Sequence, residues 1–174
     1  MGWAPQRPVV LFVCADAALP AVKRPDLALA VLKEVKKTLP DAELKIVAGR
    51  PQEELPDYYN AADVLLLTSA NEGSPNVVKE ALACNLPVVS TIVGDVPQIL
   101  SGITNCHFCS ADPAELSSRV VEILRNGART NSRDRMAAYS LERTSAAILE
   151  IYRDVCSSIR PHGQLTSPVE GPIR

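Results

Sequence analysis

Apolar residues are grouped along this chain in two alternating patterns. Five short runs are almost continuously apolar and have the length of strands buried on both faces. These runs are residues 9–13, 44–48, 64–68, 88–91 and 106–109. Between them, apolar side chains recur at helical spacing. Strands that alternate with helices through short connections predict an α/β fold, a Rossmann-like parallel sheet of about five strands with helices on both faces.

Proline marks the start of two predicted helices. Pro25 and Pro56 stand at first-turn positions, where a fixed φ and a missing N–H are tolerated. The helix that begins at Pro25 is expected to bury a stripe of apolar residues at helical spacing. The members of this stripe are Leu27, Leu29, Ala30, Leu32 and Val35.

A third helix is marked at both ends. Asp112 and Glu115 have the spacing of a capping box, and Gly127 is typical of a helix end. Two further helical stretches are expected at residues 133–138 and 145–157. The buried stripe of the third helix is predicted to contain Leu116, Val120, Ile123 and Leu124.

The chain length favours one domain. The 174 residues can bury a sizeable core, and no internal repeat is present. Residues 1–8 form a proline-containing lead or linker, and residues 9–157 the domain. Residues 158–174 show no periodicity and are expected to be a flexible tail.

Composition excludes some classes of function. The net charge is −2 and aromatic residues make up 4% of the chain, which argues against nucleic-acid binding. No apolar run reaches the roughly 18 residues of a membrane span. The five cysteines fall mostly in apolar segments, as expected of a reducing compartment, so a cytoplasmic location is predicted.

The most informative stretch is NEGSPNVVKEALACNLPVVS, which lies between two predicted strands. Ser74 is a helix N-cap type and Pro75 suits the first helical position. The backbone N–H groups from Asn76 onward would remain free, and such a helix start binds anions. Glu72 precedes this site and Glu80 lies inside the helix. A ligand with an anionic centre flanked by hydroxyl groups, such as a nucleotide sugar, fits this layout.

This stretch resembles the E-x7-E segment of retaining glycosyltransferases with the GT-B fold, above all glycosyltransferase family 4 (glycosyl transferases group 1). The two glutamates, the Gly-x-Pro turn and the Pro-Val-Val strand all coincide with that segment. The resemblance covers about residues 9–155 and implies the carboxyl-terminal, donor-binding domain. It implies transfer of a hexose from a UDP- or GDP-sugar, with no metal or other cofactor required.

The resemblance also implies a role for each matching residue. Glu72 and the turn that follows it would hold the transferred sugar and the diphosphate, whereas Glu80 would accept hydrogen bonds from ribose hydroxyls. The turn consists of Gly73, Ser74, Pro75 and Asn76. The opposing interpretation of the two glutamates is an ordinary capped helix with solvated carboxylates.

Two cations follow the first predicted strand. Lys23 matches the family's diphosphate-binding lysine, and with Glu72 it is the residue expected to act in catalysis by stabilising the departing diphosphate. An arginine usually lies about six residues earlier, where this chain has Ala17. Arg24 is a candidate substitute for that arginine. Without a ligand, Lys23 and Arg24 would be two solvated charges near a helix start.

The chain departs from the family pattern in two large ways. Only the carboxyl-terminal half is present, so an amino-terminal acceptor domain or a separate chain would have to position the acceptor, and the isolated chain is not expected to transfer sugar efficiently. An edge strand-helix unit is also missing, which predicts strand order 2-1-4-5-6 in the family's count and alters the base pocket. A stand-alone nucleotide-sugar-binding or regulatory module without transferase activity is therefore the alternative function.

Smaller departures affect the predicted site. Asp95 stands where the family prefers a second glycine and would weaken diphosphate binding unless it turns outward. Gln98 stands where the family usually has a glutamate. Asn85 replaces a glycine at a helix end, which is tolerated because asparagine adopts the left-handed conformation.

Two other candidate sites are weaker. Cys106 and Cys109 form a single CxxC, and zinc sites normally need a second ligand pair at suitable spacing. Asp16 could suggest a phosphoacceptor, but Ala15 and Ala17 do not supply the acidic neighbour that such a site needs. Both sites are therefore read as structural.

Overall fold

The computed structural model describes residues 7–15 and 21–158. The chain divides into two compact units, Met1–Ala137 and Ala138–Arg174. The strands are β1 (Val9–Cys14), β2 (Glu43–Ala48), β3 (Val64–Leu67), β4 (Val88–Thr91) and β5 (His107–Cys109). The helices are α1 (Pro25–Lys36), α2 (Leu55–Ala61), α3 (Asn76–Ala83), α4 (Val96–Leu100), α5 (Pro113–Asn126), α6 (Arg133–Met136) and α7 (Leu141–Ser158). The described residues also form the short 3-10 turns η1 (Ala21–Lys23), η2 (Gln52–Glu54) and η3 (Ala137–Tyr139).

The five strands form one parallel sheet in the order β2-β1-β3-β4-β5. This is the predicted order once the missing edge unit is counted, so the fold prediction is confirmed. The connection between β2 and β3, residues 49–63, contains only η2 and α2. As a result β2 is an edge strand, and no central pairing is broken.

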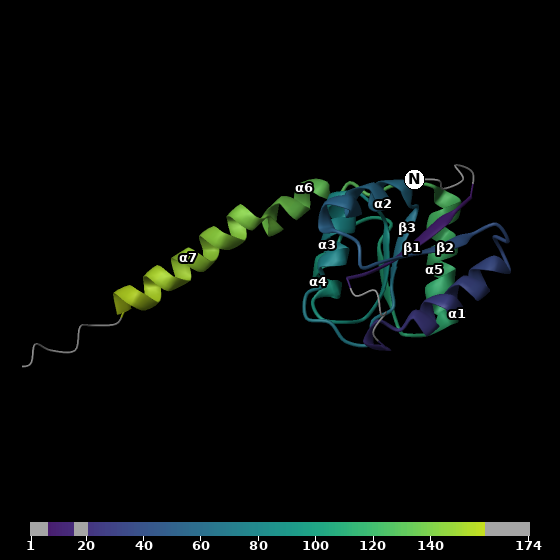
Figure 1. Ribbon diagram of the computed structural model, residues 1–174, viewed down its shortest axis with the longest axis horizontal. Coiled ribbons are helices and arrows are strands. Elements are labelled where there is room, and N and C mark those ends of the chain that lie inside the picture. Colours follow the sequence, from purple (N-terminus) through teal and green to yellow (C-terminus); the bar gives the residue numbers. More distant parts are fainter. Residues whose placement is uncertain (1–6, 16–20, 159–174) are drawn as a thin grey trace, which may run out of the picture. The chain divides into compact units, whose positions relative to one another are not determined.

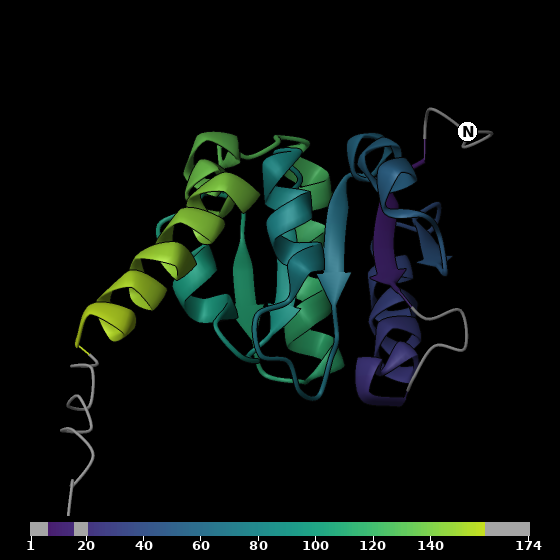
Figure 2. The ribbon, with the colours of Figure 1, turned by 60° about the vertical axis from the view of Figure 1, so that its left-hand side comes forward.

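Helices cover both faces of the sheet. Figures 1 and 2 show α1 and α5 on one face and α2, α3 and α4 on the other. Each face has its own apolar core. All residues of β1 and β3 are buried, as expected of central strands in a parallel sheet.

The apolar stripe of α1 differs in part from the prediction. The buried residues are Leu27, Ala28, Val31 and Val35, whereas Leu29 is 54% exposed. Leu27, Val31 and Val35 recur every four residues and therefore share one face. Leu29 lies about half a turn from Leu27, so it points to solvent.

The cap of α5 is only half of the predicted capping box. The Asp112 carboxylate accepts a hydrogen bond from the Glu115 N–H at 3.1 Å, and Gly127 ends the helix in the left-handed conformation with φ 63°. The Glu115 carboxylate does not return the bond. It instead accepts from the N–H of Ser110 at 3.1 Å and from the Ser110 hydroxyl. Glu115 therefore fixes the β5–α5 connection as well as the helix start.

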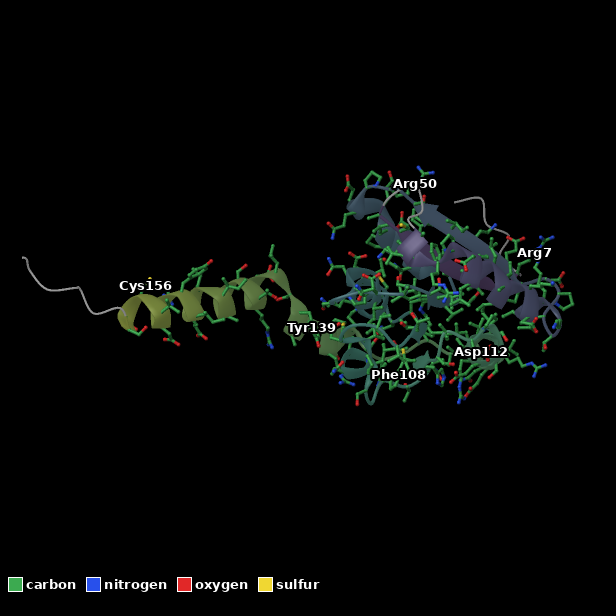
Figure 3. All side chains as sticks on the ribbon, turned by 90° about the horizontal axis from the view of Figure 1, so that it is seen from below. Arg7, Arg50, Phe108, Asp112, Tyr139 and Cys156 are labelled. Atoms are coloured by element: carbon green, nitrogen blue, oxygen red, sulfur yellow. The ribbon has the colours of Figure 1, made fainter. Side chains whose placement is uncertain are left out.

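The second unit contains α7, which starts four residues earlier than predicted. None of its residues is buried, and Figure 3 shows side chains projecting along its length. Leu141, Ile148, Tyr152 and Val155 fall on one stripe of this helix at spacings of three, four and seven. Most of the predicted lead and tail, residues 1–6 and 159–174, lies outside the described residues. No described helix is both long enough and apolar enough to span a membrane.

Candidate functional site

The topology places a switch point at the carboxyl ends of β1 and β3. These strands are neighbours, but the chain leaves β1 towards α1 on one face and β3 towards α3 on the other. Ligands of open α/β sheets bind at such a switch point. The residues that follow β1 and β3 are therefore expected to contact a ligand.

Lys23 and Glu72 meet at this edge. The Lys23 Nζ lies 2.5 Å from Glu72 Oε1, and the side chains are 25% and 15% exposed. The Ser69 hydroxyl also donates to Glu72 Oε1, at 2.8 Å. Both donors contact the same oxygen, and no described residue donates to Oε2.

The backbone around this ion pair is tied down by hydrogen bonds from the end of β3. The Thr68 hydroxyl lies 2.9 Å from the carbonyl oxygens of Lys23 and Arg24. The Ala70 N–H donates to the Val22 carbonyl at 2.8 Å. Because the segments after β1 and β3 are joined in this way, Lys23 is held beside Glu72 without a ligand.

Arg24 lies next to this pair but has a different partner. Its Nη2 is 3.5 Å from the carboxylate of Asp26, and its backbone is left-handed with φ 50°, which is uncommon for a residue other than glycine. Whether Arg24 reaches a diphosphate stays a prediction. Asp16 and Ala17 lie outside the described residues.

The start of α3 differs from the predicted cap. The helix begins at Asn76 with Pro75 in the N-cap position, and no side chain caps it. The Ser74 hydroxyl instead donates to Asp95 Oδ2 at 2.6 Å. A carboxylate is a stronger acceptor for a hydroxyl than a neutral group, and the Asp95 N–H also holds the Gly73 carbonyl at 3.0 Å. The first N–H groups of α3 are therefore not used by Ser74.

Two glycines shape the turn before α3. A Cβ added at Gly73 would meet nothing within 4 Å, so the space beside it is open. A Cβ at Gly94, which has φ 49°, would lie 2.0 Å from the Gly73 carbonyl oxygen. Only glycine allows the loop before α4 to approach this closely.

Asp95 does not turn outward. Its Oδ2 accepts from Ser74, and its Oδ1 is buried with no hydrogen-bond partner among the described residues. The carboxylate therefore lies against the turn that is predicted to bind an anion. Its negative charge would repel an anionic ligand at the start of α3.

Glu80 lines a cavity of about 250 Å³ at the end of β1. Apolar walls come from β1, α2 and α3. The polar groups come from the connection after β2 and from α3. The lining residues are Val13, Cys14, Ala15, Arg50, Gln52, Leu55, Asn76, Val77 and Glu80. Such a mixture of apolar walls and a few polar groups is typical of small-molecule sites.

Two side chains fix the Glu80 carboxylate. The hydroxyl of Tyr59, which is 1% exposed, donates to Glu80 Oε2 at 2.7 Å, and the Gln52 amide lies 3.4 Å from Oε1. Burial and the hydrogen bond to Glu80 raise the pKa of Tyr59 far above its usual value, so it remains a donor.

The far end of α3 is satisfied by the segment after α5. The Arg129 guanidinium donates to the carbonyls of Tyr59 at 2.9 Å, Ala62 at 3.0 Å and Cys84 at 3.2 Å. The Ser132 hydroxyl and the Arg133 Nε donate to carbonyls in the last turn of α3, those of Leu82 and Ala83, at 2.7 and 2.8 Å. Asn85 adopts the predicted left-handed conformation, with φ 55°.

Cys106 and Cys109 do not converge. Cys106 packs against the core under α3, whereas Cys109 belongs to the core under α1 and α5. Burial raises the pKa of the Cys106 thiol to about 11. Among the described residues, no group of three or more His, Cys, Asp or Glu side chains could hold a metal.

The predicted residues thus form two clusters on one edge of the sheet. Lys23 and Glu72 are in direct contact, and Asn76 and Glu80 line the cavity. Sequence reasoning missed Tyr59, Gln52 and Ser69. Ser69 follows a predicted buried strand and could have been found as a polar residue at a strand end.

Known proteins resemble this chain in sequence and in fold. Residues 46–126 match the model of the family described as glycosyl transferases group 1. D-inositol 3-phosphate glycosyltransferase from Corynebacterium urealyticum is 28% identical over 97% of this chain and 38% of the relative. The protein of the same name from Saccharomonospora viridis is 33% identical over 62% of this chain and 26% of its own length. Residues 46–126 therefore resemble the glycosyl transferases group 1 family, and the relatives in sequence are glycosyltransferases.

Solved structures support the fold. Sucrose-phosphate synthase from Thermosynechococcus elongatus superimposes with a TM-score of 0.75 and 20% identity, over 90% of this chain and 47% of that protein. The fold of this chain is therefore Rossmann-like, of the GT-B type. The family match includes Tyr59, Glu72 and Glu80, whereas Lys23 precedes it. The chain spans well under half the length of these relatives.

Proposed function

We propose that this chain is the donor-binding domain of a retaining glycosyltransferase of glycosyltransferase family 4. The enzyme would transfer a hexose from a UDP- or GDP-sugar. The observation that carries this proposal is the arrangement of groups at the switch point between β1 and β3. The Lys23 ammonium group and the start of an eight-residue helix without a side-chain cap lie there, and Asn76 and Glu80 of that helix line a cavity.

The diphosphate would bind at the start of α3. The N–H groups there carry partial positive charge and the Lys23 ammonium carries a full one. Lys23 is already placed by its bond to Glu72, so it would be shared between the carboxylate and the diphosphate. This arrangement keeps the negative charge of Glu72 from facing the diphosphate unscreened.

Each glutamate would contact a different part of the donor. Oε2 of Glu72 receives no hydrogen bond from the described residues and would accept one from a hydroxyl of the sugar. Glu80 would accept from ribose hydroxyls, with the base between the apolar walls of the cavity.

In the transfer step the bond between the anomeric carbon and the diphosphate oxygen breaks, and its electron pair stays on that oxygen. The acceptor hydroxyl oxygen forms the new bond to the anomeric carbon, and its proton passes to the departing diphosphate oxygen. Lys23 and the helix start would stabilise the charge that develops on the diphosphate. The acceptor itself would be positioned by an amino-terminal domain or a separate chain.

Titration with UDP, GDP and their sugars tests this proposal, by calorimetry or ligand-observed NMR. We expect Lys23→Met and Glu80→Ala each to weaken binding about tenfold or more, because each removes a charged contact. Lys33→Met, which removes an exposed lysine from α1, serves as the matched control and should bind as the unaltered chain does. Absence of binding at millimolar UDP and GDP would refute the proposal.

The second candidate is a nucleotide-sugar-binding or regulatory module without transfer. The short β2–β3 connection favours it, because residues 49–63 replace a longer segment near the predicted base pocket. The two roles differ in one measurement. A chain that binds the donor but releases no UDP or GDP, even when the amino-terminal half of a relative is added, has the second role.

A further inference from the structure

The buried hydroxyl group of Tyr59 donates a hydrogen bond to the Glu80 carboxylate. Tyr59 comes from α2, lies in the core beneath α3 and is 1% exposed, yet its hydroxyl reaches Glu80 Oε2 at 2.7 Å. A buried phenol needs a hydrogen-bond partner, so this contact also satisfies Tyr59. The structural need of the tyrosine alone does not explain why its partner carboxylate lines a cavity.

The two oxygens of Glu80 differ in how firmly they are held. Oε2 has a short bond from a side chain that the core immobilises. Oε1 has only the Gln52 amide, at 3.4 Å, which is near the upper limit of a hydrogen bond. Gln52 belongs to an exposed single 3-10 turn, η2, and can rotate away at little cost.

Both partners come from the same short connection. Residues 49–63 provide Gln52 at the cavity wall and Tyr59 behind Glu80. The connection therefore holds one oxygen of the carboxylate permanently and covers the other loosely.

We propose that Tyr59 is a positioning residue, which holds Glu80 so that Oε1 faces the ligand, and that Gln52 is the partner that the ligand displaces. This inference rests on the proposed function, because the displacing groups are the ribose hydroxyls of the nucleoside diphosphate. Tyr59 itself does not touch the ligand. It acts by restricting the rotamers of a long side chain before binding, which lowers the entropic cost of binding.

The test compares three ligands on five proteins. UDP, GDP and inorganic pyrophosphate are titrated into the unaltered chain and into Tyr59→Phe, Tyr58→Phe, Glu80→Ala and the double variant Tyr59→Phe/Glu80→Ala. Tyr58→Phe removes a hydroxyl from the neighbouring position, which does not line the cavity. Pyrophosphate lacks ribose, so it reports on the diphosphate site alone.

We expect Tyr59→Phe to weaken UDP or GDP binding about tenfold and to leave pyrophosphate binding unchanged. In the Glu80→Ala background the same substitution should have no further effect, because the group that Tyr59 positions is absent. Tyr58→Phe should bind all three ligands normally. Unfolding by urea, followed for each variant, separates loss of binding from loss of structure.

Two results would overturn the inference. Equal nucleotide affinity in Tyr59→Phe and the unaltered chain would leave Tyr59 with a structural role only, as would an equal loss for nucleotide and pyrophosphate. The proposed function would survive both results. If the unaltered chain binds neither UDP nor GDP, the proposed function and this inference both fail.

Gln52→Ala tests the displaced partner. Because Gln52 must leave Oε1 before a hydroxyl binds, its removal should keep nucleotide affinity equal or raise it up to about threefold. A loss of affinity would show that Gln52 contacts the ligand, which would overturn its assigned role.

Discussion

The two ends of α3 differ in whether side chains form hydrogen bonds with their backbone groups. At its carboxyl end, Arg129, Ser132 and Arg133 donate to the last carbonyls of the helix or to the residue that follows it. At its amino end no side chain is a cap, and Ser74 turns to Asp95 instead. Unsatisfied groups at a helix end are costly unless water or a ligand meets them. One end of this helix therefore supports the fold, and the other is available for binding.

The difference extends to how each end is shaped. The carboxyl end is held by long cationic side chains. The amino end is held by the close approach of two backbone segments, Gly73 and Gly94. Substitutions can therefore change one end without the other.

Gly94→Ala should have the largest effect. The new methyl group would lie 2.0 Å from the Gly73 carbonyl oxygen, on a backbone with φ 49°. We expect the free energy of unfolding in urea to fall by about 3 kcal/mol and UDP binding to be lost. Gly73→Ala is the matched control, because its methyl group meets nothing within 4 Å. Gly73→Ala should keep the free energy of unfolding of the unaltered chain and lose only affinity for UDP. Equal destabilisation by both variants would show that close packing at Gly94 is not the cause.

Arg129→Met should destabilise the carboxyl end of α3 and leave the amino end unchanged. The substitution removes a guanidinium that donates to carbonyls of Tyr59, Ala62 and Cys84. We expect the free energy of unfolding to fall by about 2 kcal/mol, because several carbonyls lose a charged donor but some regain water. Arg125→Met, at an exposed position in α5, is the control. Affinity for pyrophosphate should be unchanged, and a tenfold loss would mean that the two ends are coupled.

Asp95→Asn should strengthen the binding of an anionic ligand at the amino end of α3. The amide keeps an oxygen for the Ser74 hydroxyl and removes a negative charge beside the proposed diphosphate site. We expect affinity for UDP to rise about threefold at low salt and the gain to shrink at high salt, as for any screened charge. Calorimetry at two ionic strengths measures both effects. A fall in affinity would show that the Asp95 charge assists binding.

The smallest effect concerns His107, on the edge strand far from α3 in sequence. Burial lowers the pKa of His107, and the nearby Glu122 offsets this only in part. The folded chain then binds this proton less readily than the unfolded chain, so stability should be greatest above the ordinary pKa of about 6.5 and decline as the pH falls below it. Urea unfolding at pH 7.5 and pH 5.5 should show a smaller decline in His107→Gln. An equal decline in both proteins would exclude His107 as a cause.

The fold was largely predictable because its signals are local. Continuous apolar runs identify buried parallel strands, and Pro25, Asp112 and Gly127 mark helix ends through their own backbone chemistry. The error at Leu29 has the same origin. Apolar identity alone does not say which side of a helix faces the sheet.

The residues of the candidate site were predictable where they share one motif or follow a predicted strand. Glu72 and Glu80 stand within one loop and helix, and Lys23 follows a strand whose end must reach the same edge. The partners of Ser74 and Glu80 were not predicted. Asp95 and Tyr59 are each 21 residues distant from them in the chain, and only the packing of separate elements joins them.

The short connection between β2 and β3 is a place where the sequence can change during evolution without loss of the fold. The same few residues link two strands, wall a cavity and immobilise a carboxylate. An insertion there would lie beside an edge strand, which the sheet tolerates, and it would rebuild the surface that we propose contacts a nucleoside. We expect natural variants of this segment to diverge in the nucleotide they select long before they diverge in architecture.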